Sequence, residues 1–186
     1  MRIHSYLSPD CEARTDSKIH RWGVFAKKDI KKGKLVAIWG GYVMTLKEYQ
    51  KLCAYVRDYE YPVQIYKGFF LGPRKKSDLD DCEMFNHCCD ANAGVKGQNL
   101  LFARRNIKAG EEICFDYETT DTEGLNFVCR CGSPVCRGRI TGQSWKNPAF
   151  QKQCKGFFSW YIQQKIDRLN MKRAKSSKKK RGKASR

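Results

Sequence analysis

The sequence lacks long apolar runs and has no apolar segment at its start. No stretch of its 186 residues approaches the roughly 20 apolar residues that a membrane-spanning helix needs. The opening segment MRIHSYLSPDCEARTDSK holds no apolar core of the kind that marks a secretory signal. These absences predict an intracellular protein of a reducing compartment, without membrane contact. Its ten cysteines are therefore expected to be thiols or metal ligands rather than disulfides.

Acidic residues are also scarce, with 19 Asp and Glu against 37 Lys and Arg and a formal net charge of +18. The excess is uneven, because the last fifteen residues, from Lys172 to Arg186, contain nine basic residues and no acid. A block of one sign cannot bury a core and repels itself, so we expect a disordered tail over 171–186. Such a tail favours contact with DNA or a nuclear address, and a purely solubilising tail is an equal alternative.

Short strands and few helices are expected elsewhere. Apolar patterns bounded by turn residues predict strands in three stretches: 19–44 with a turn at Gly33, 62–73, and 99–118 with a turn at 108–110. Thr45 and Glu48 have the spacing of a capping box at the start of a helix over 45–59. A second helix is expected from Pro148 to Leu169, with proline in its first turn. The pattern predicts a mainly β domain of the α+β class, followed by a helical extension.

A cysteine-rich turn, CRCGSPVC, follows the last expected strand. Its members Cys129, Cys131 and Cys136 have the spacing C-x-C-x4-C, so three thiolates can face one point. A structural zinc site takes four ligands, so a fourth must come from elsewhere, and Cys88 or Cys89 in NHCCDAN is the obvious donor if the fold brings them together. The spacing predicts one structural zinc ion, and inert buried thiols are the alternative. The cysteines that occur singly are expected to be small buried apolar side chains: Cys11, Cys53, Cys82, Cys114 and Cys154.

Three motifs precede that turn in order: RWGVFA at 21–26, NHCCDAN at 86–92 and GEEICFDY at 110–117. Together with the cysteine turn they resemble the SET-domain protein-lysine methyltransferases and their post-SET zinc segment. The second motif matches N-H-x-C-x-P-N except at Ala91, and the third matches G-E-E-x-x-x-D-Y in full. The resemblance runs from about His20 to Gly138, roughly two thirds of the chain.

The resemblance implies a SET fold, which consists of small curved β-sheets around a C-terminal pseudoknot. In that pseudoknot the C-terminal segment threads under a preceding loop. We therefore expect five parts in the chain: a polar lead-in at 1–18, a SET domain at 19–120, a post-SET zinc segment at 121–140, a helical extension at 141–170 and the basic tail at 171–186.

Roles for individual residues also follow from the resemblance. Tyr117 corresponds to the catalytic tyrosine, and Phe115 to the position that sets how many methyl groups fit, which favours di- or trimethylation. The residues implied in S-adenosylmethionine binding are Trp22, Gly23, Asn86, His87, Tyr117 and Phe127. The implied zinc ligands are Cys89, Cys129, Cys131 and Cys136, which favours Cys89 over Cys88.

One departure affects the lysine channel. The family often has a tyrosine and a glutamate in the strand before the first helix, where this chain has Trp39 and Gly41. Either Trp39 lines the channel as a larger wall, or Tyr42 does so after a shift in register. The shape of the lysine pocket depends on which of the two is present there.

The implied function is an S-adenosylmethionine-dependent protein-lysine N-methyltransferase acting on histones or another basic chromatin-type protein. Two other classes stay open: a catalytically silent SET-like module that binds a lysine-bearing tail, and a basic nucleic-acid-binding protein with a structural zinc. The methyltransferase and the nucleic-acid-binding protein are compatible, because the basic tail could hold the enzyme on DNA in chromatin or a nucleoid. The expected location is the nucleus or chromosome in a eukaryote, and otherwise the cytoplasm, the nucleoid or a host cell reached by export.

Overall fold

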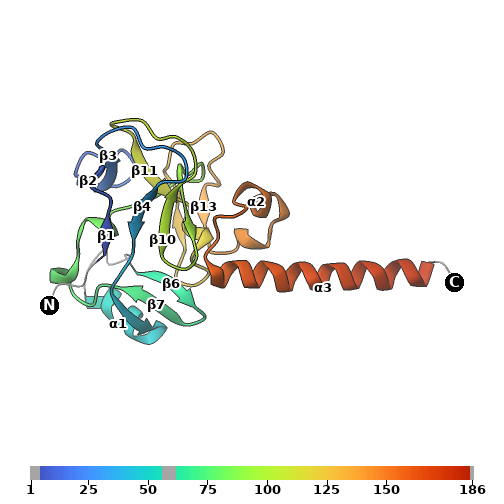
Figure 1. Ribbon diagram of the computed structural model, residues 1–186. Helices are drawn as coiled ribbons and strands as arrows, with labels where there is room; N and C mark the ends of the chain where they lie inside the picture. Colours follow the sequence, from blue (N-terminus) through green and yellow to red (C-terminus); the bar gives the residue numbers. More distant parts are fainter. Residues whose placement is uncertain (1–4, 56–61, 185–186) are drawn as a thin grey trace.

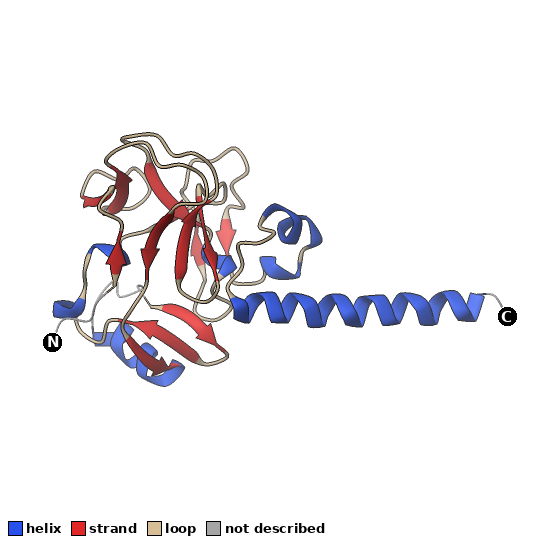
Figure 2. Cartoon of the chain, in the orientation of Figure 1, coloured by secondary structure: helices blue, strands red, loops and turns tan. Residues whose placement is uncertain are grey.

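The computed structural model describes residues 5–55 and 62–184. Within these residues the chain forms small sheets of short strands separated by loops (Figure 2). Two four-stranded sheets have the orders β1-β4-β10-β9 and β2-β3-β11-β8. A three-stranded sheet has the order β5-β7-β6, and β12 pairs with β13. The expected mainly β architecture of small sheets is confirmed.

The strands are β1 Tyr6–Leu7, β2 Cys11–Arg14, β3 Gly23–Ala26, β4 Leu35–Ile38, β5 Tyr42–Thr45, β6 Val63–Tyr66, β7 Phe69–Gly72, β8 Asn86–His87, β9 Ala93–Lys96, β10 Leu100–Ala103, β11 Glu112–Phe115, β12 Phe127–Val128 and β13 Arg139–Ile140. The helices are α1 Leu46–Tyr55, α2 Pro148–Gln153 and α3 Trp160–Ala184. Short 3-10 turns are η1 Lys76–Asp78, η2 Asp81–Glu83, η3 Tyr117–Thr119 and η4 Ser144–Lys146.

The two four-stranded sheets enclose the main core. Val24, Val36, Leu101 and Ile113 are fully buried there, each from a different strand. The β3–β4 connection turns at Gly33, whose φ of +83° is a conformation that favours glycine. The expected turn at this position is therefore confirmed, and the single cluster shows that both sheets fold around one core.

Helix α1 covers one side of the β5-β7-β6 sheet (Figure 1). Its start is a capping box, because the Thr45 N–H donates to Glu48 Oε2 at 2.8 Å and the Glu48 N–H donates to Thr45 Oγ1 at 3.3 Å. Tyr49 stacks on Phe70 of β7, with ring centroids 4.6 Å apart. The expected helix and cap are confirmed up to Tyr55, and the rest of the expected range, 56–59, lies outside the described residues.

Strand β11 joins two motifs that are far apart in the sequence. It lies between β3, to which it is antiparallel, and β8, to which it is parallel. The parallel register places Cys114 opposite Asn86 and Phe115 opposite His87. The end of GEEICFDY therefore runs beside the start of NHCCDAN. The pseudoknot expected from the resemblance requires such a passage of a later segment, here β11, beside an earlier one, here β8.

The prediction of a single helix from Pro148 to Leu169 is wrong. Helix α2 ends at Gln153 and α3 begins at Trp160. Between them Gly156 has a φ of +81°, which breaks the right-handed helical backbone. Apolar residues of both helices and of the segment between them nevertheless pack into one second cluster with Trp145: Phe150, Cys154, Phe158, Tyr161, Ile162 and Ile166.

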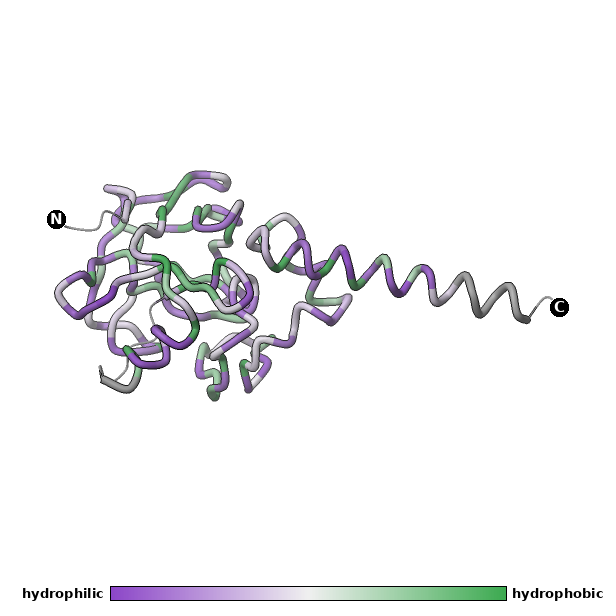
Figure 3. The backbone as a smooth tube through the Cα atoms, turned by 90° about the horizontal axis from the view of Figure 1, so that it is seen from below, coloured by the Kyte–Doolittle hydropathy of each residue, from purple (hydrophilic) through white to green (hydrophobic). Residues whose placement is uncertain are grey.

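The expected disorder of the basic tail is also not what the structure shows, since α3 continues to Ala184 and projects away from the sheets (Figure 1). Lys, Arg and Ala are good helix formers, and the packed first turns of α3 remove the cost of nucleation for the residues that follow. Figure 3 shows mainly hydrophilic residues along the coloured part of α3 beyond the packed turns. None of the helices in residues 5–55 and 62–184 combines the length and apolar character that a membrane crossing requires.

Candidate active site

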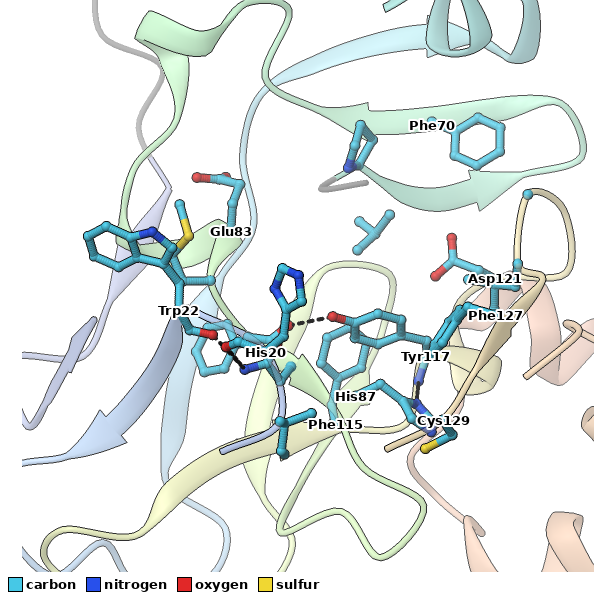
Figure 4. A pocket seen from close by; sticks show the side chains of 18 of the residues that line it. His20, Trp22, Phe70, Glu83, His87, Phe115, Tyr117, Asp121, Phe127 and Cys129 are labelled. Carbon is cyan, nitrogen blue, oxygen red and sulfur yellow. Dashed lines mark hydrogen bonds between the residues drawn. The ribbon is translucent and has the colours of Figure 1, made fainter. Parts of the chain in front are cut away.

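A cavity of about 510 Å³ opens between the β5-β7-β6 sheet, β8, the end of β11 and the segment 121–130 (Figure 4). Its volume is within the range of small-molecule sites. The residues expected at the catalytic or cofactor-binding site that line it are Trp22, Trp39, Asn86, His87, Phe115, Tyr117 and Phe127. The fold thus brings seven residues from five separate parts of the sequence around one space.

Tyr117 lies at the first residue of η3, with its ring in the cavity wall. Its hydroxyl donates to the Phe85 carbonyl oxygen at 2.7 Å, and its backbone N–H donates to His87 Nδ1 at 3.1 Å (Figure 4). The ring centroid lies 4.8 Å from that of Phe115 and 6.1 Å from that of Phe127. Tyr117 is therefore held at its hydroxyl and at its backbone N–H, and its ring faces other aromatic rings.

Trp39, and not Tyr42, forms part of the cavity wall. The Trp39 side chain is buried, with 5% of the residue exposed, and its Nε1–H donates to the Cys82 carbonyl at 3.0 Å. Its ring centroid is 4.9 Å from that of Phe115. Tyr42 is 38% exposed, and the Arg74 guanidinium lies over its ring at 4.6 Å. Of the two sequence alternatives, the structure brings only Trp39 to the aromatic cavity.

Asn86 holds the loop that contains Trp22. Its Nδ2 donates to the Trp22 carbonyl at 2.6 Å and to Glu112 Oε1 at 2.7 Å. Gly23 follows at the start of β3 but does not line the cavity. A Cβ at Gly23 would come within 2.5 Å of Glu112 Oε1, so a larger residue there would displace this carboxylate. Gly23 thus packs against Glu112 and lies outside the cavity lining, whereas Trp22 lines the cavity.

His87 links Tyr117 to the cysteine cluster. Burial lowers its pKa to about 3, so the ring is neutral at physiological pH. Because Nδ1 accepts the Tyr117 N–H, the proton of the neutral ring is on Nε2. That Nε2 lies 3.3 Å from Cys89 Sγ. His87 is therefore placed to position the Tyr117 backbone and Cys89. Its Nδ1 accepts a hydrogen bond and its Nε2 carries the proton, so neither nitrogen is available as a base toward the cavity.

The sulfur atoms of Cys89, Cys129, Cys131 and Cys136 all lie within 4.8 Å of one another. β12 and β13 hold the two ends of the cysteine turn together. A tetrahedron of four zinc–sulfur bonds of about 2.3 Å places its sulfurs about 3.8 Å apart. The Cys89 and Cys129 sulfurs are 3.9 Å apart, which is close to that geometry. Four converging thiols are the donor set typical of structural zinc, and Cys88 is not among them.

A family model described as the SET domain matches residues 21–118, more than half of the chain. The chain belongs to the SET domain family. Among its relatives, the Drosophila melanogaster histone-lysine N-methyltransferase ash1 is 33% identical over 136 residues, which cover 66% of this SET chain and 6% of ash1. Histone-lysine N-methyltransferase SUV39H2 of Xenopus tropicalis is 30% identical over 163 residues, which cover 70% of this chain and 39% of that protein. The SET chain thus matches only part of the length of these relatives.

Solved structures show the same fold. The methyltransferase domain of human histone-lysine N-methyltransferase SETMAR has a TM-score of 0.55 at 20% identity, covering 72% of this chain and 58% of that one. KRYPTONITE, solved in complex with mCHG DNA and SAH, has a TM-score of 0.52 at 23% identity, covering 72% of this chain and 29% of that one. The small sheets described above are therefore those of a SET fold.

An ion network around the SET-domain tyrosine was missed from the sequence. Arg137 donates to both oxygens of Asp116, at 2.7 and 2.8 Å, and to Glu118 Oε2 at 3.2 and 3.0 Å. Both carboxylates are buried, and they flank Tyr117 in sequence. The signal available in the sequence was the pair of acids on either side of the expected catalytic tyrosine. Buried acids need a cation, and Arg137 comes directly after the last cysteine of the turn.

Three carboxylates in the cavity wall were also missed: Glu83, Asp121 and Glu123. Asp121 Oδ1 accepts the Gln64 N–H at 2.6 Å, and Glu123 Oε2 accepts Gln64 Nε2–H at 2.8 Å. These bonds tie the segment after η3 to strand β6. Glu83 was recognisable as the last member of an Asp-x-x-Glu capping box, which the structure contains at η2. Asp121 and Glu123 therefore bond to strand β6 and also line the cavity.

Proposed function

We propose that this SET domain is an S-adenosylmethionine-dependent protein-lysine N-methyltransferase. The observation that carries the proposal is Tyr117, whose hydroxyl is held 2.7 Å from the Phe85 carbonyl at the edge of an aromatic cavity. Relatives that are named histone-lysine methyltransferases support the same activity. So does a neighbour of the same fold that was solved with SAH.

The chain's own residues perform three tasks in this proposal. S-adenosylmethionine supplies the methyl group on a sulfonium centre. A free lysine has a pKa of about 10.4, and the desolvating walls formed by Trp39, Phe115 and Tyr117 favour the neutral amine that must attack. The hydroxyl of Tyr117 and the Phe85 carbonyl orient the amine. The aromatic rings exclude water, so positioning supplies much of the rate.

Binding of the cofactor is assigned to other residues of the cavity wall. Trp22, Asn86, His87 and Phe127 are the expected contacts that line it. The His87 and Phe127 rings are 5.8 Å apart at a near-perpendicular angle, so they form one wall. Because Phe127 begins the hairpin that carries the cysteine turn, this wall depends on the thiol cluster. We propose that one zinc ion bound by Cys89 and its three cluster partners holds the hairpin in place.

The substrate is proposed to be a basic protein tail, of a histone or another chromatin-type protein, and the site of action chromatin. The support is the names of the relatives. Di- or trimethylation is proposed as the product, because neither Phe115 nor Trp39 offers a hydroxyl to hold a water molecule in the channel.

The experiment that tests the activity compares methyl transfer by the wild type, Tyr117→Phe and Tyr42→Phe. Labelled S-adenosylmethionine is supplied with core histones and other basic proteins. Loss of one positioned hydroxyl is expected to lower the rate roughly 10²–10³-fold in Tyr117→Phe. Tyr42→Phe makes the same chemical change outside the cavity and should keep the wild-type rate.

Calorimetry measures whether Tyr117→Phe still binds the cofactor. If it does, the loss of rate reflects lost catalysis and not lost folding. Equal rates in all three proteins would contradict the role of Tyr117. Cofactor binding without transfer to any basic protein would favour a silent lysine-binding module. No cofactor binding by the wild type would refute the proposal.

A further inference from the structure

The second half of α3 carries a surface that the proposed methyltransferase site does not use. Tyr161, Ile162 and Ile166 anchor the first turns of the helix in the second apolar cluster. From Asn170 to Ser177, in contrast, every residue is exposed. The helix extends away from the body of the domain over this range (Figure 1). A partner can therefore approach it without contacting the sheets.

Basic residues form a stripe along one side of this helix. Arg168, Lys172 and Lys175 follow one another at spacings of four and three residues, which places them on one face. In the sequence, Lys179 and Lys183 follow at spacings of four residues, and no acid occurs after Asp167. At a rise of about 1.5 Å per residue, the described part of the stripe, from 168 to 175, extends over about 10 Å. The three residues of the stripe whose side chains are described form no ion pair with any described carboxylate.

The packed face of α3 is a different one. Ile162, Ile166 and Leu169 lie along it, and Arg173 continues their spacing. Arg173 accordingly turns toward the protein and donates to the Lys146 carbonyl at 2.9 Å. The helix thus uses one face to hold itself on the domain. The basic stripe lies on another face and is accessible to a partner outside this chain.

We propose that α3 is a DNA-binding arm whose basic stripe contacts the phosphates along the major groove of double-stranded DNA. Its charge is complementary to the phosphate backbone, and its lysines predict binding that depends on salt and not on sequence. An α-helix fits the B-DNA major groove, which is about 12 Å wide, whereas the major groove of double-stranded RNA is too narrow and deep. The arm would hold the domain close to chromatin while the cavity stays open to a protein tail.

A second basic surface lies on the turn between β3 and β4 and provides a matched control. Lys31 and Lys32 are exposed there. Neighbouring charges on that surface are partly neutralised, since Lys28 pairs with Asp10 at 2.9 Å and Lys108 pairs with Asp29 at 2.8 Å. Removing two lysines from each surface changes the net charge equally. A difference between the two variants therefore reports where the DNA lies.

The test measures binding of the full chain to a fluorescent DNA duplex of about 20 base pairs, without cofactor, by anisotropy at several salt concentrations. The variants are Lys172→Gln with Lys175→Gln, and Lys31→Gln with Lys32→Gln. For the α3 variant, affinity near 0.1 M salt should fall roughly tenfold for each lysine, and the slope of log Kobs against log salt should fall by about 1.8. The control variant should bind within about twofold of the wild type.

Three results would overturn the proposal. The first is that the wild type does not bind duplex DNA, and the second is that both variants lose affinity equally. The third is tighter binding to double-stranded or single-stranded RNA of equal length, which would assign the arm to another nucleic acid. The α3 variant should methylate a short free peptide at the wild-type rate, so loss of DNA binding and loss of catalysis are distinguished.

Discussion

Arg137 shows how a single residue ties the cluster of four thiols to Tyr117. Its guanidinium binds Asp116 and Glu118, the two neighbours of Tyr117 in sequence. Its own backbone N–H lies 3.4 Å from Cys89 Sγ, and it follows Cys136 directly. A buried carboxylate without its cation costs several kcal/mol. The position of the tyrosine therefore depends on the correct folding of the cysteine turn.

Phe115 is the residue where the product can be tested. Its ring lies 4.8 Å from that of Tyr117 and 4.9 Å from that of Trp39, so a hydroxyl added to it would extend into the aromatic channel. Phe115→Tyr is expected to hold a water molecule there and to shift the main product from di- or trimethyl-lysine to monomethyl-lysine. Mass spectrometry of the substrate after long incubation measures the distribution.

Phe69→Tyr is the matched control for that change, because Phe69 is exposed on β7 and does not line the cavity. It should leave the product distribution as in the wild type. An unchanged distribution in Phe115→Tyr, with activity retained, would show that another side chain limits the number of methyl groups.

At the scale of elements, the hairpin of β12 and β13 is predicted to depend on zinc, and two adjacent cysteines allow a matched test. Cys89 belongs to the cluster of four sulfurs, whereas Cys88 does not. Cys89→Ser is expected to lower the zinc content from about one ion per chain to near zero after dialysis. Cys88→Ser should keep the ion and the wild-type melting temperature. Metal analysis and thermal unfolding give both readouts without any activity assay.

The opposite result for the two serine variants would make Cys88 the ligand. Retention of zinc by both variants would show that three thiols from the 129–136 turn suffice with another donor. Absence of zinc from the wild type, purified without chelators, would refute the metal assignment and leave the cluster as buried thiols.

For the whole molecule, stability is predicted to fall as pH rises from about 6 to 8. Burial raises the pKa of Glu83 to about 8, and burial raises that of Asp121 to about 7. Between the ordinary value, 4.5 for Glu83, and the raised one, the folded chain holds a proton that the unfolded chain has released. Stability from this carboxyl is thus present at low pH and is lost as pH rises through the folded pKa.

Urea unfolding at pH 6 and pH 8.5 measures the effect. Glu83→Gln should remove part of the decline, on the order of 1 kcal/mol, because the amide does not ionise. Glu12→Gln, at an exposed position on β2, is the control and should follow the wild type. An equal decline in Glu83→Gln and the wild type would show that the buried carboxyl does not control this pH dependence.

Much of the architecture could be predicted because its causes are local. The Thr45–Glu48 cap, the Gly33 turn and the C-x-C-x4-C turn each depend on groups a few residues apart, which a sequence displays directly. The motif order added the SET fold and the residues around the cavity. The expected helix from Pro148 to Leu169 was wrong because the apolar stripe continues across Gly156 while the backbone does not.

The sequence by itself determined the class of the domain, its short strands, the motifs that line the cavity and three of the four clustered thiols. Only the tertiary structure decided between Trp39 and Tyr42 in the cavity wall, and it placed Cys89, which the motif resemblance favoured over Cys88, in the cluster. It alone placed Arg137 between two buried acids. The physical reason is that these contacts join residues far apart in the chain, where packing and strand register, rather than local hydrogen bonds, set which side chains meet.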